Sequence, residues 1–189
     1  MKLKAGLEVH QQLNCGKLFC KCNNSDKGND AVFKRKLHAT SSEMGNIDIA
    51  AKAEGTREFT YFNKSCNCLV YTDEEPPRGP NPKAIEIALE FAKLVKSEIL
   101  SEAHFMRKIV IDGSNTSGFQ RTGLIAIGGQ IEYESGTLDI EQICLEEDSC
   151  RKGEDNNQYL LDRLGIPLLE VTTKPQFPDT ATPSRGHPP

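Results

Sequence analysis

The stretch AIGGQIEYESGTLDIEQIC, residues 126–144, carries the clearest fold signal in the chain. Its two arms, 126–134 and 138–144, are rich in residues that favour strands and flank Ser135-Gly136, a pair that suits a tight turn. The stretch therefore predicts an antiparallel hairpin. Further strands are expected before and after it, at 107–112 (RKIVID) and at 168–173 (LLEVTT).

One long helix is expected between these strands and the N-terminal part of the chain. Asn81 can cap its first turn, and Pro82 suits the first helical position. Apolar residues then recur at helical spacing as far as Val95, and the pattern predicts a helix that ends near Ile99. It follows DEEPPRGPNP, residues 73–82, in which the prolines exclude regular structure.

The first residues predict a strand with one polar and one apolar face. Leu7 and Val9 alternate with Glu8 and His10, so both polar side chains are expected on the same face. Residues 14–31 indicate a turn-rich loop or ribbon, and residues 60–71 indicate strand material around a tight Cys-Asn-Cys turn. These elements together predict the α+β class, with mostly antiparallel sheet, one long helix and a small ribbon.

Composition excludes several classes of protein. The chain has 189 residues, of which 26% are charged and 37% hydrophobic, an ordinary globular balance. It contains no apolar run of the roughly 18–20 residues that a spanning helix needs, and its first residues lack the apolar core of a secretory signal. A cytoplasmic location is therefore expected. The net charge of -4 is unlike that of a dedicated nucleic-acid-binding domain.

Four of the seven cysteines form two close pairs, Cys20-x-Cys22 and Cys66-x-Cys68. An odd number of cysteines without a secretory signal argues against a disulfide framework. Zn²⁺ takes four sulfur ligands tetrahedrally, and two short pairs lower the entropic cost of closing such a site. The pairs predict a structural zinc site, while four unligated thiols packed as small apolar side chains remain the alternative.

Acidic side chains and one histidine form a second group. Glu8 and His10 share a strand face, Glu146, Glu147 and Asp148 follow a predicted strand, and Glu170 interrupts an apolar strand. A buried carboxylate without a partner costs several kcal/mol, so Glu170 requires an explanation. Each acid alone also fits a solvated position. Together they supply hard oxygen ligands and an imidazole, which suit Mg²⁺ beside a phosphate substrate.

Residues 112–123, DGSNTSGFQRTG, form a third candidate site. Glycine, hydroxyl side chains and Arg121 could surround a phosphate, although the stretch matches neither common glycine-rich nucleotide motif. An ordinary turn explains it equally well.

Several blocks of this sequence, in order, resemble the GatB/GatE family of tRNA-dependent amidotransferases, and its archaeal GatE branch in particular. The resemblance covers about residues 4–175 and is carried by the following blocks: GLEVHQQL (6–13), TDEEPP (72–77), MRKIVIDGSNTSGFQRT (106–122), ICLEED (143–148) and YLLDRLGIPLLEV (159–171).

The resemblance implies an enzyme that uses ATP to phosphorylate the glutamyl side chain of Glu-tRNA(Gln) and then amidates it to Gln-tRNA(Gln). It also implies that ammonia comes from a partner glutaminase, the asparaginase-like D-type subunit of the archaeal enzyme. Phosphorylation has a simple chemical reason, because a carboxylate is a poor acyl electrophile until it carries a leaving group.

The same resemblance assigns candidate site residues. It implies that Glu8, His10, Glu147 and Glu170 are catalytic and bind Mg²⁺, with His10 either a ligand or the group that positions ammonia. The candidates for ATP contact are Arg107, Lys108, Ser114, Thr116 and Arg121. A zinc knuckle present in part of the family matches Cys20, Cys22, Cys66 and Cys68.

The domain expectation follows from the same resemblance. Residues 1–175 correspond to part of the family's cradle domain and residues 176–189 to a proline-rich tail or a truncated end, while the inserted, helical and tail domains are absent. The chain is therefore expected to be a fragment, inactive alone, that meets tRNA mainly through missing parts. A zinc-stabilised interaction module without catalytic activity remains the alternative.

Overall fold

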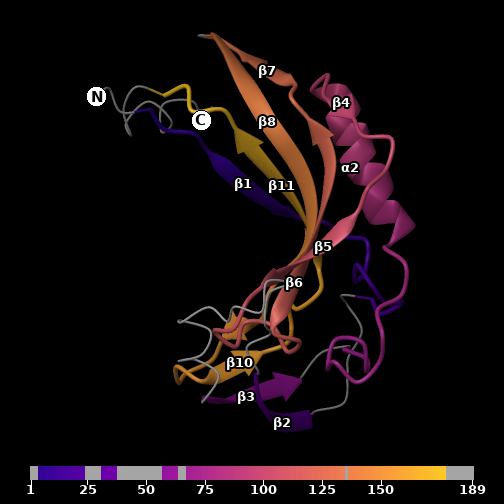
Figure 1. Cartoon of the computed structure of the whole chain (residues 1–189), viewed down its shortest axis with the longest axis vertical. Helices are drawn as coiled ribbons and strands as arrows, with labels where there is room; N and C mark the ends of the chain where they lie inside the picture. Colours follow the sequence, from indigo (N-terminus) through magenta and orange to yellow (C-terminus); the bar gives the residue numbers. More distant parts are fainter. Residues whose placement is uncertain (1–3, 24–30, 38–56, 64–66, 135, 178–189) are drawn as a thin grey trace, which may run out of the picture.

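Among the residues that the structure describes, the fold consists of two β-sheets and one helix. The structure is a computed structural model and describes residues 4–23, 31–37, 57–63, 67–134 and 136–177. Figure 1 shows a large sheet that curves along the long axis of the molecule, with a small sheet at its lower end. No helix in these ranges has the length and apolar character needed to cross a membrane.

The large sheet has seven strands, and all its pairings are antiparallel. Its main path runs through β1 (Glu8–Gln12), β11 (Pro167–Thr173), β8 (Gly136–Glu147), β6 (Phe119–Ile127) and β4 (Glu98–Ile99). β5 (Phe105–Ile109) pairs with β6, and β7 (Gln130–Tyr133) pairs with β8. The three central strands, β11, β8 and β6, all come from residues 119–173, whereas the edge strand β1 comes from the N-terminal part of the chain.

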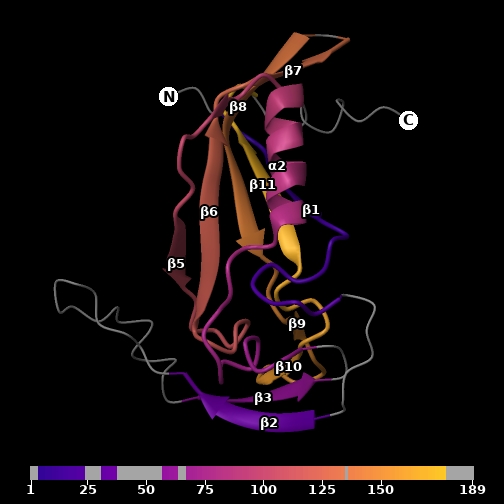
Figure 2. The ribbon, with the colours of Figure 1, turned by 90° about the vertical axis from the view of Figure 1, so that its right-hand side faces the viewer.

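The small sheet joins β2 (Ala31–Lys36), β3 (Glu58–Asn63), β10 (Gln158–Leu160) and β9 (Arg151–Lys152) in that order. β10 runs parallel to β3, whereas the other two pairings are antiparallel. Figure 2 places this sheet below the large one. The strands of the small sheet were not predicted apart from part of β3.

The helix α2 (Pro82–Leu94) lies on one side of the large sheet and leaves the other side open (Figure 1). The Asn81 side chain accepts a hydrogen bond from the Lys83 N–H, which confirms the predicted cap. Small residues, Ala84, Ala88 and Ala92, form the buried stripe and allow the helix to approach the sheet closely. The opposite face of the sheet forms the inside of the curve.

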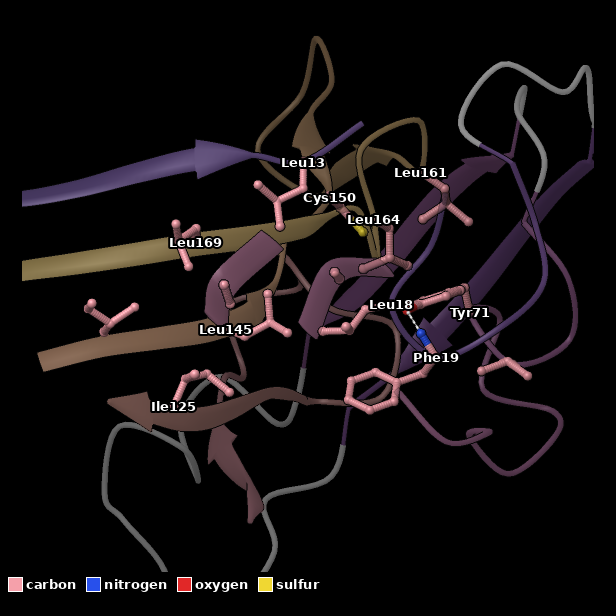
Figure 3. Close-up of a cluster of buried hydrophobic side chains, with 14 of the residues drawn as sticks. Leu13, Leu18, Phe19, Tyr71, Ile125, Leu145, Cys150, Leu161, Leu164 and Leu169 are labelled. Carbon is pink, nitrogen blue, oxygen red and sulfur yellow. Dashed lines mark hydrogen bonds between the residues drawn. The ribbon is translucent and has the colours of Figure 1, made fainter. Parts of the chain in front are cut away.

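A single apolar cluster joins the helix, the large sheet and the loops between the two sheets (Figure 3). Tyr71 is at one end of this cluster, where its hydroxyl accepts a hydrogen bond from the Phe19 N–H at 3.0 Å. Gly165 lies against the Tyr71 ring with φ of +78°, and a β-carbon there would come within 2.1 Å of the ring. No other residue fits this turn, because the contact and the left-handed backbone both exclude a side chain.

The predicted α+β class and mostly antiparallel sheet are confirmed, as is the hairpin, formed by β7 and β8. The first predicted arm is two elements, because Ile127 ends β6 and the glycines at 128 and 129, both with positive φ, break the strand before β7. The predicted last strand is confirmed as β11.

Three predicted boundaries were wrong. The helix ends at Leu94, not near residue 99, because Lys96 adopts φ of 58° and turns the chain into β4. The predicted strand 107–112 is β5, which spans Phe105–Ile109. Residues 119–123 belong to the nine-residue strand β6, not to a glycine-rich loop.

The edge strand β1 also differs from its prediction. It begins at Glu8, and every residue in it is exposed, including Val9 with 54% of its surface accessible. The expected apolar face is not buried because β1 lies at the sheet edge, beyond the cover of α2. Ala5 instead pairs with Phe177, a buried residue in the segment expected to be a tail.

Candidate functional site

A cluster of three carboxylates and one imidazole lies on the open face of the large sheet. His10 Nε2 is 3.6 Å from Glu8 Oε1, 3.7 Å from Glu146 Oε2 and 3.4 Å from Glu170 Oε2. The side chains come from β1, β8 and β11, three neighbouring strands of one sheet. Glu8, His10, Glu146 and Glu170 together form the acidic cluster.

Strand register explains why these side chains meet. His10 pairs with Glu170, and Glu170 pairs with Cys144, so the three side chains point to the same side of the sheet. Glu8 lies two residues from His10 on β1, and Glu146 lies two residues from Cys144 on β8. Side chains two residues apart on a strand point to the same face of the sheet. The predicted convergence of Glu8, His10 and Glu170 is therefore present in the structure.

Glu147 does not join this cluster. The neighbouring residues 146 and 147 of β8 project to opposite faces of the sheet, and Glu147 points toward the helix side. It accepts hydrogen bonds from the Arg121 backbone N–H at 2.9 Å and from the Arg121 guanidinium at 2.8 Å. The carboxylate that reaches His10 is that of Glu146, so the structure gives Glu146 the place that the family resemblance assigned to Glu147.

The Glu147–Arg121 pair is buried among aromatic rings. The guanidinium carbon of Arg121 lies 5.2 Å from the Phe19 ring centre and 5.0 Å from that of Phe119. Burial raises the pKa of Glu147, and the charge and hydrogen bonds of Arg121 oppose that rise. The pair is thus part of the packing between the sheet and the loops.

Burial also affects the acidic cluster. It raises the pKa of Glu170, and the neighbouring carboxylates Glu146 and Glu8 raise it further, whereas His10 lowers it. Within the described ranges, His10 is the basic side chain found at ion-pair distance from Glu146 and Glu170. A divalent cation would offset the negative charge that three carboxylates concentrate here.

The cluster borders a groove of about 570 Å³ on the open face. Its walls come from five strands, from the turn after β8 and from the turn between β10 and β11. Its lining residues are Glu8, His10, Gln12, Lys108, Gln120, Glu146, Asp148, Ser149, Arg163 and Leu168. The groove is large enough for part of a nucleotide or an aminoacyl group.

One wall of the groove is built around Asp148, which is buried. Gln12 Nε2 donates a hydrogen bond to Asp148 Oδ2 at 2.6 Å, and the Ser149 backbone N–H donates to Oδ1 at 2.8 Å. Arg163 Nε lies 3.7 Å from the same carboxylate. These contacts connect β1, the end of β8 and the turn before β11.

The five predicted ATP contacts lie in different places. Lys108 lines the groove, because it pairs with Gln120 on the open face. Arg107 and Arg121 pair with each other on the opposite face, and the Arg107 guanidinium stacks on Phe119. Arg107 and Arg121 do not face the acidic cluster, because alternate side chains of a strand point to opposite faces of the sheet.

The two predicted hydroxyl contacts have local partners. Ser114 Oγ donates to Asp112 Oδ1 at 2.6 Å, and its backbone N–H donates to the same oxygen. Thr116 is buried, and its hydroxyl donates to the Tyr71 carbonyl at 2.7 Å. The loop that holds them connects β5 to β6, contacts the small sheet through the hydrogen bond from the Tyr159 hydroxyl to the Asp112 carbonyl, and lies outside the groove lining.

A second cluster contains thiols. One sulfur atom from each of Cys20, Cys22 and Cys68 lies within 4.8 Å of the other two. The Cys22 N–H donates to the Cys20 sulfur at 3.3 Å, and the Cys68 carbonyl accepts from the N–H groups of Tyr71 and Thr72. Cys66, the fourth predicted ligand, lies outside the described residues. The three thiols fit the donor chemistry of a structural Zn²⁺ site.

The pKa values of these thiols differ. Burial raises the pKa of Cys20 to about 11. Burial acts in the same direction on Cys68, but hydrogen bonds from the Val70 N–H and from the Cys20 and Cys22 thiols outweigh it and lower the pKa of Cys68. Metal binding would deprotonate all three thiols, since the thiolate is the ligand.

Sequence reasoning missed the groove residues other than the acids and Lys108. Asp148 was considered as an acid, but Gln12, Gln120, Ser149 and Arg163 were not placed with it. The alternation of side chains along 140–147 could have separated Glu146 from Glu147, if the strand had been predicted to continue past Cys144.

Comparisons with known proteins show the family of this chain. Residues 3–185 match the family model described as the GatB/GatE catalytic domain. The chain is 50% identical over 94% of its length to the E-type subunit of glutamyl-tRNA(Gln) amidotransferase from Thermoplasma volcanium, and 49% identical over 95% to that of Thermoplasma acidophilum. It is 49% identical over 93% of its length to that of Pyrococcus furiosus.

The chain covers 31%, 31% and 29% of these three relatives, so it spans about a third of their length. The matched part contains every residue of the acidic cluster and of the thiol cluster. On the extent of the family match, this chain belongs to the GatB/GatE catalytic domain family.

Proposed function

We propose that this chain is the catalytic segment of a tRNA-dependent amidotransferase that converts Glu-tRNA(Gln) to Gln-tRNA(Gln). The relatives that it resembles are named as E-type subunits of glutamyl-tRNA(Gln) amidotransferase. The observation that carries the proposal is the convergence of Glu8, His10, Glu146 and Glu170 at one end of the groove.

The proposed reaction has two steps. The glutamyl side-chain carboxylate attacks the γ-phosphorus of ATP, which forms an acyl phosphate and releases ADP. Ammonia then attacks the acyl carbon, phosphate leaves, and the nitrogen loses a proton to give the amide. The first step converts a poor acyl electrophile into a good one, and the second forms the carbon–nitrogen bond.

The acidic cluster would hold Mg²⁺, because carboxylate oxygens are its preferred protein ligands. A Mg²⁺ ion held there would supply positive charge to offset that of the ATP phosphates. Glu146 and Glu170 are buried and are held by the sheet, whereas Glu8 is exposed and can adjust to a ligand. His10 is either a fourth ligand or the group that positions ammonia.

Lys108 is the predicted ATP contact that this proposal retains. It lines the same groove as the acids, and its ammonium group can bind a phosphate oxygen of the nucleotide. Arg163, beside Asp148 on the far wall, can meet a second anionic or carbonyl group of the substrate. On this proposal the acidic cluster would bind the cation, and Lys108 and Arg163 would contact the nucleotide and the substrate.

Two further parts of the proposal come from the family resemblance. A separate glutaminase of the asparaginase-like type would supply ammonia, and tRNA would be bound largely by regions corresponding to the other two thirds of the relatives' length. The thiol cluster would hold a structural Zn²⁺ ion that stabilises the loops around Cys20 and Cys68.

The test uses a chimera in which this chain replaces the matching third of the Thermoplasma acidophilum relative, assembled with that organism's glutaminase partner. The expected result is ATP-dependent formation of Gln-tRNA(Gln), which Glu170→Gln or Glu146→Gln abolishes while the protein stays folded. A folded, assembled chimera that amidates equally well with both substitutions would refute the mechanism.

The second candidate, a zinc-stabilised interaction module, is favoured by the thiol cluster alone. Metal analysis combined with titration of Mn²⁺ and ATP separates the two. A chain that contains zinc but binds neither Mn²⁺ nor ATP would support the module.

A further inference from the structure

The Glu146 carboxylate accepts a hydrogen bond from Thr122, a residue outside the groove lining. Thr122 Oγ1 donates a hydrogen bond to Glu146 Oε1 at 2.8 Å, and the two residues are directly paired between β6 and β8. The other oxygen, Oε2, lies 3.7 Å from His10 Nε2. The two oxygens of this carboxylate therefore have different surroundings, one within the sheet and one at the cluster.

This arrangement limits how Glu146 can turn. Its side chain is only 3% exposed, so the sheet, and not bulk water, supplies the hydrogen-bond donor to Oε1. Thr122 is β-branched, and such side chains have few accessible rotamers on a strand. The second donor near Glu146 is weaker, because Gln120 Nε2 is 3.4 Å from Oε2 and donates instead to the Glu147 carbonyl at 2.7 Å.

We propose that Thr122 is a positioning residue that orients Glu146 so that Oε2 faces the acidic cluster and can bind a divalent cation. The inference rests on the proposed function, since it assigns a partner to one of the proposed metal ligands. Hydrogen bonds to ligating carboxylates usually fix their orientation and strengthen metal binding. Thr122 acts through Glu146 and touches neither substrate nor cation.

The comparison that isolates the hydroxyl is Thr122→Ser against Thr122→Ala, because these two variants differ by a single oxygen atom. Thr122→Val retains the branched shape without the donor. Thr60→Val is the matched control for Thr122→Val, because it makes the same exchange on β3 of the small sheet, away from the groove. Each variant is first checked for folding by its thermal unfolding midpoint in the presence of chelator.

The measurement is the dissociation constant for Mn²⁺, determined by calorimetric titration of the chain. Wild type, Thr122→Ser and Thr60→Val are expected to bind with the same affinity. Thr122→Ala and Thr122→Val are expected to bind about 10–100-fold more weakly, the usual effect of losing a hydrogen bond to a metal ligand. If one of these two variants fails to fold, the other supplies the comparison with Thr122→Ser.

The outcomes separate this inference from the proposed function. If the wild-type chain binds no Mn²⁺, the proposed metal site is refuted, and the positioning role of Thr122 is refuted with it. Tight binding by the wild type and equally tight binding by folded Thr122→Ala refutes the positioning role alone. In that case a lower thermal midpoint for Thr122→Ala would show that the hydroxyl serves stability only.

Discussion

Glu146 and Glu147 are adjacent residues with opposite environments. Glu146 reaches His10 on the open face, and Glu147 forms a buried pair with Arg121 on the other face. The sequence contains both acids, and the family resemblance pointed to Glu147. A strand that continues through residue 147 separates them by its alternation, so the assignment depended on where β8 ends.

At the residue scale, the first prediction concerns the Arg121–Glu147 pair. Arg121→Met should lower the free energy of unfolding by about 3–5 kcal/mol, because it leaves a buried carboxylate without its partner. The double variant Arg121→Met/Glu147→Leu should recover most of this loss, since it removes both charges. Chemical unfolding of the two variants measures the difference. A double variant no more stable than the single one would contradict the prediction.

The second prediction is the effect of pH on metal-free protein. The pKa of Glu170 is raised in the fold, chiefly by burial. Between its ordinary pKa of about 4.5 and the raised value, the Glu170 carboxyl is therefore more protonated in the folded chain than in the unfolded chain. The contribution of Glu170 to the free energy of unfolding must therefore decrease as pH rises through this range.

Glu170→Gln should show a smaller decrease over the same pH range, because the titrating group is gone. Exposed Glu102, which lies beside His104, provides the control Glu102→Gln, expected to follow the wild-type profile. Urea unfolding at a series of pH values in the presence of chelator gives both curves. Superimposable profiles for wild type and Glu170→Gln would count against the burial of this carboxylate.

At the element scale, the end of α2 offers a prediction about strain. Lys96 has φ of 58°, and the N–H groups of Lys96 and Ser97 bond back to the carbonyls of Lys93 and Ala92. This is a Schellman ending with a lysine where glycine is usual. Lys96→Gly should stabilise the chain by about 0.5–1 kcal/mol. Glycine relieves the strain of the left-handed backbone, and this gain exceeds the cost of the greater entropy that glycine gives the unfolded chain.

The control for this prediction is Lys93→Gly, three residues earlier in the last turn of the helix. There the same exchange should cost about 1 kcal/mol, because glycine lowers helix propensity. Thermal unfolding distinguishes the opposite signs. A loss of stability in Lys96→Gly would mean that the backbone at this position is not strained.

Elements with local signals were predictable, and elements defined by distant pairing were not. The Asn81-Pro82 start of α2 and the turn between β7 and β8 are encoded by neighbouring residues. The end of α2 was mispredicted because a lysine occupies the position where glycine would have marked it. β9 and β10 are short, and long-range partners define their pairing, so no period in the sequence reveals them.

The candidate site was predictable to a similar extent. Glu8 and His10 share a face by alternation alone, and Glu170 was recognised as an acid inside an apolar strand. Gln12, Asp148 and Arg163 come together only when β1, the end of β8 and the turn before β11 are in place. Their contacts depend on the tertiary structure, which the sequence pattern did not reveal.

At the scale of the whole molecule, the buried residue Lys17 links the thiol cluster to the turn that precedes β11, the strand that carries Glu170. Its Nζ donates hydrogen bonds to the carbonyls of Leu164 at 2.5 Å and Asp162 at 3.3 Å. Its backbone N–H bonds to the Cys22 carbonyl at 3.0 Å. A change in the thiol loop would therefore affect the turn that leads into β11.

This linkage predicts the effect of metal removal. Chelation of zinc should lower the thermal midpoint of the chain by at least several degrees, because binding energy at a structural zinc site is also folding energy. Cys68→Ser should have a lowered midpoint and no further response to chelator. Metal analysis before and after chelation provides the stoichiometry. An unchanged midpoint in the zinc-loaded wild type after complete zinc removal would exclude a stabilising role.

The most direct test of the acidic cluster is a calorimetric titration of Mn²⁺ into wild type, Glu146→Gln and Glu147→Gln. One binding site is expected in the wild type and in Glu147→Gln, and loss of that site in Glu146→Gln. Binding that survives in Glu146→Gln but disappears in folded Glu147→Gln would contradict the arrangement of side chains described above.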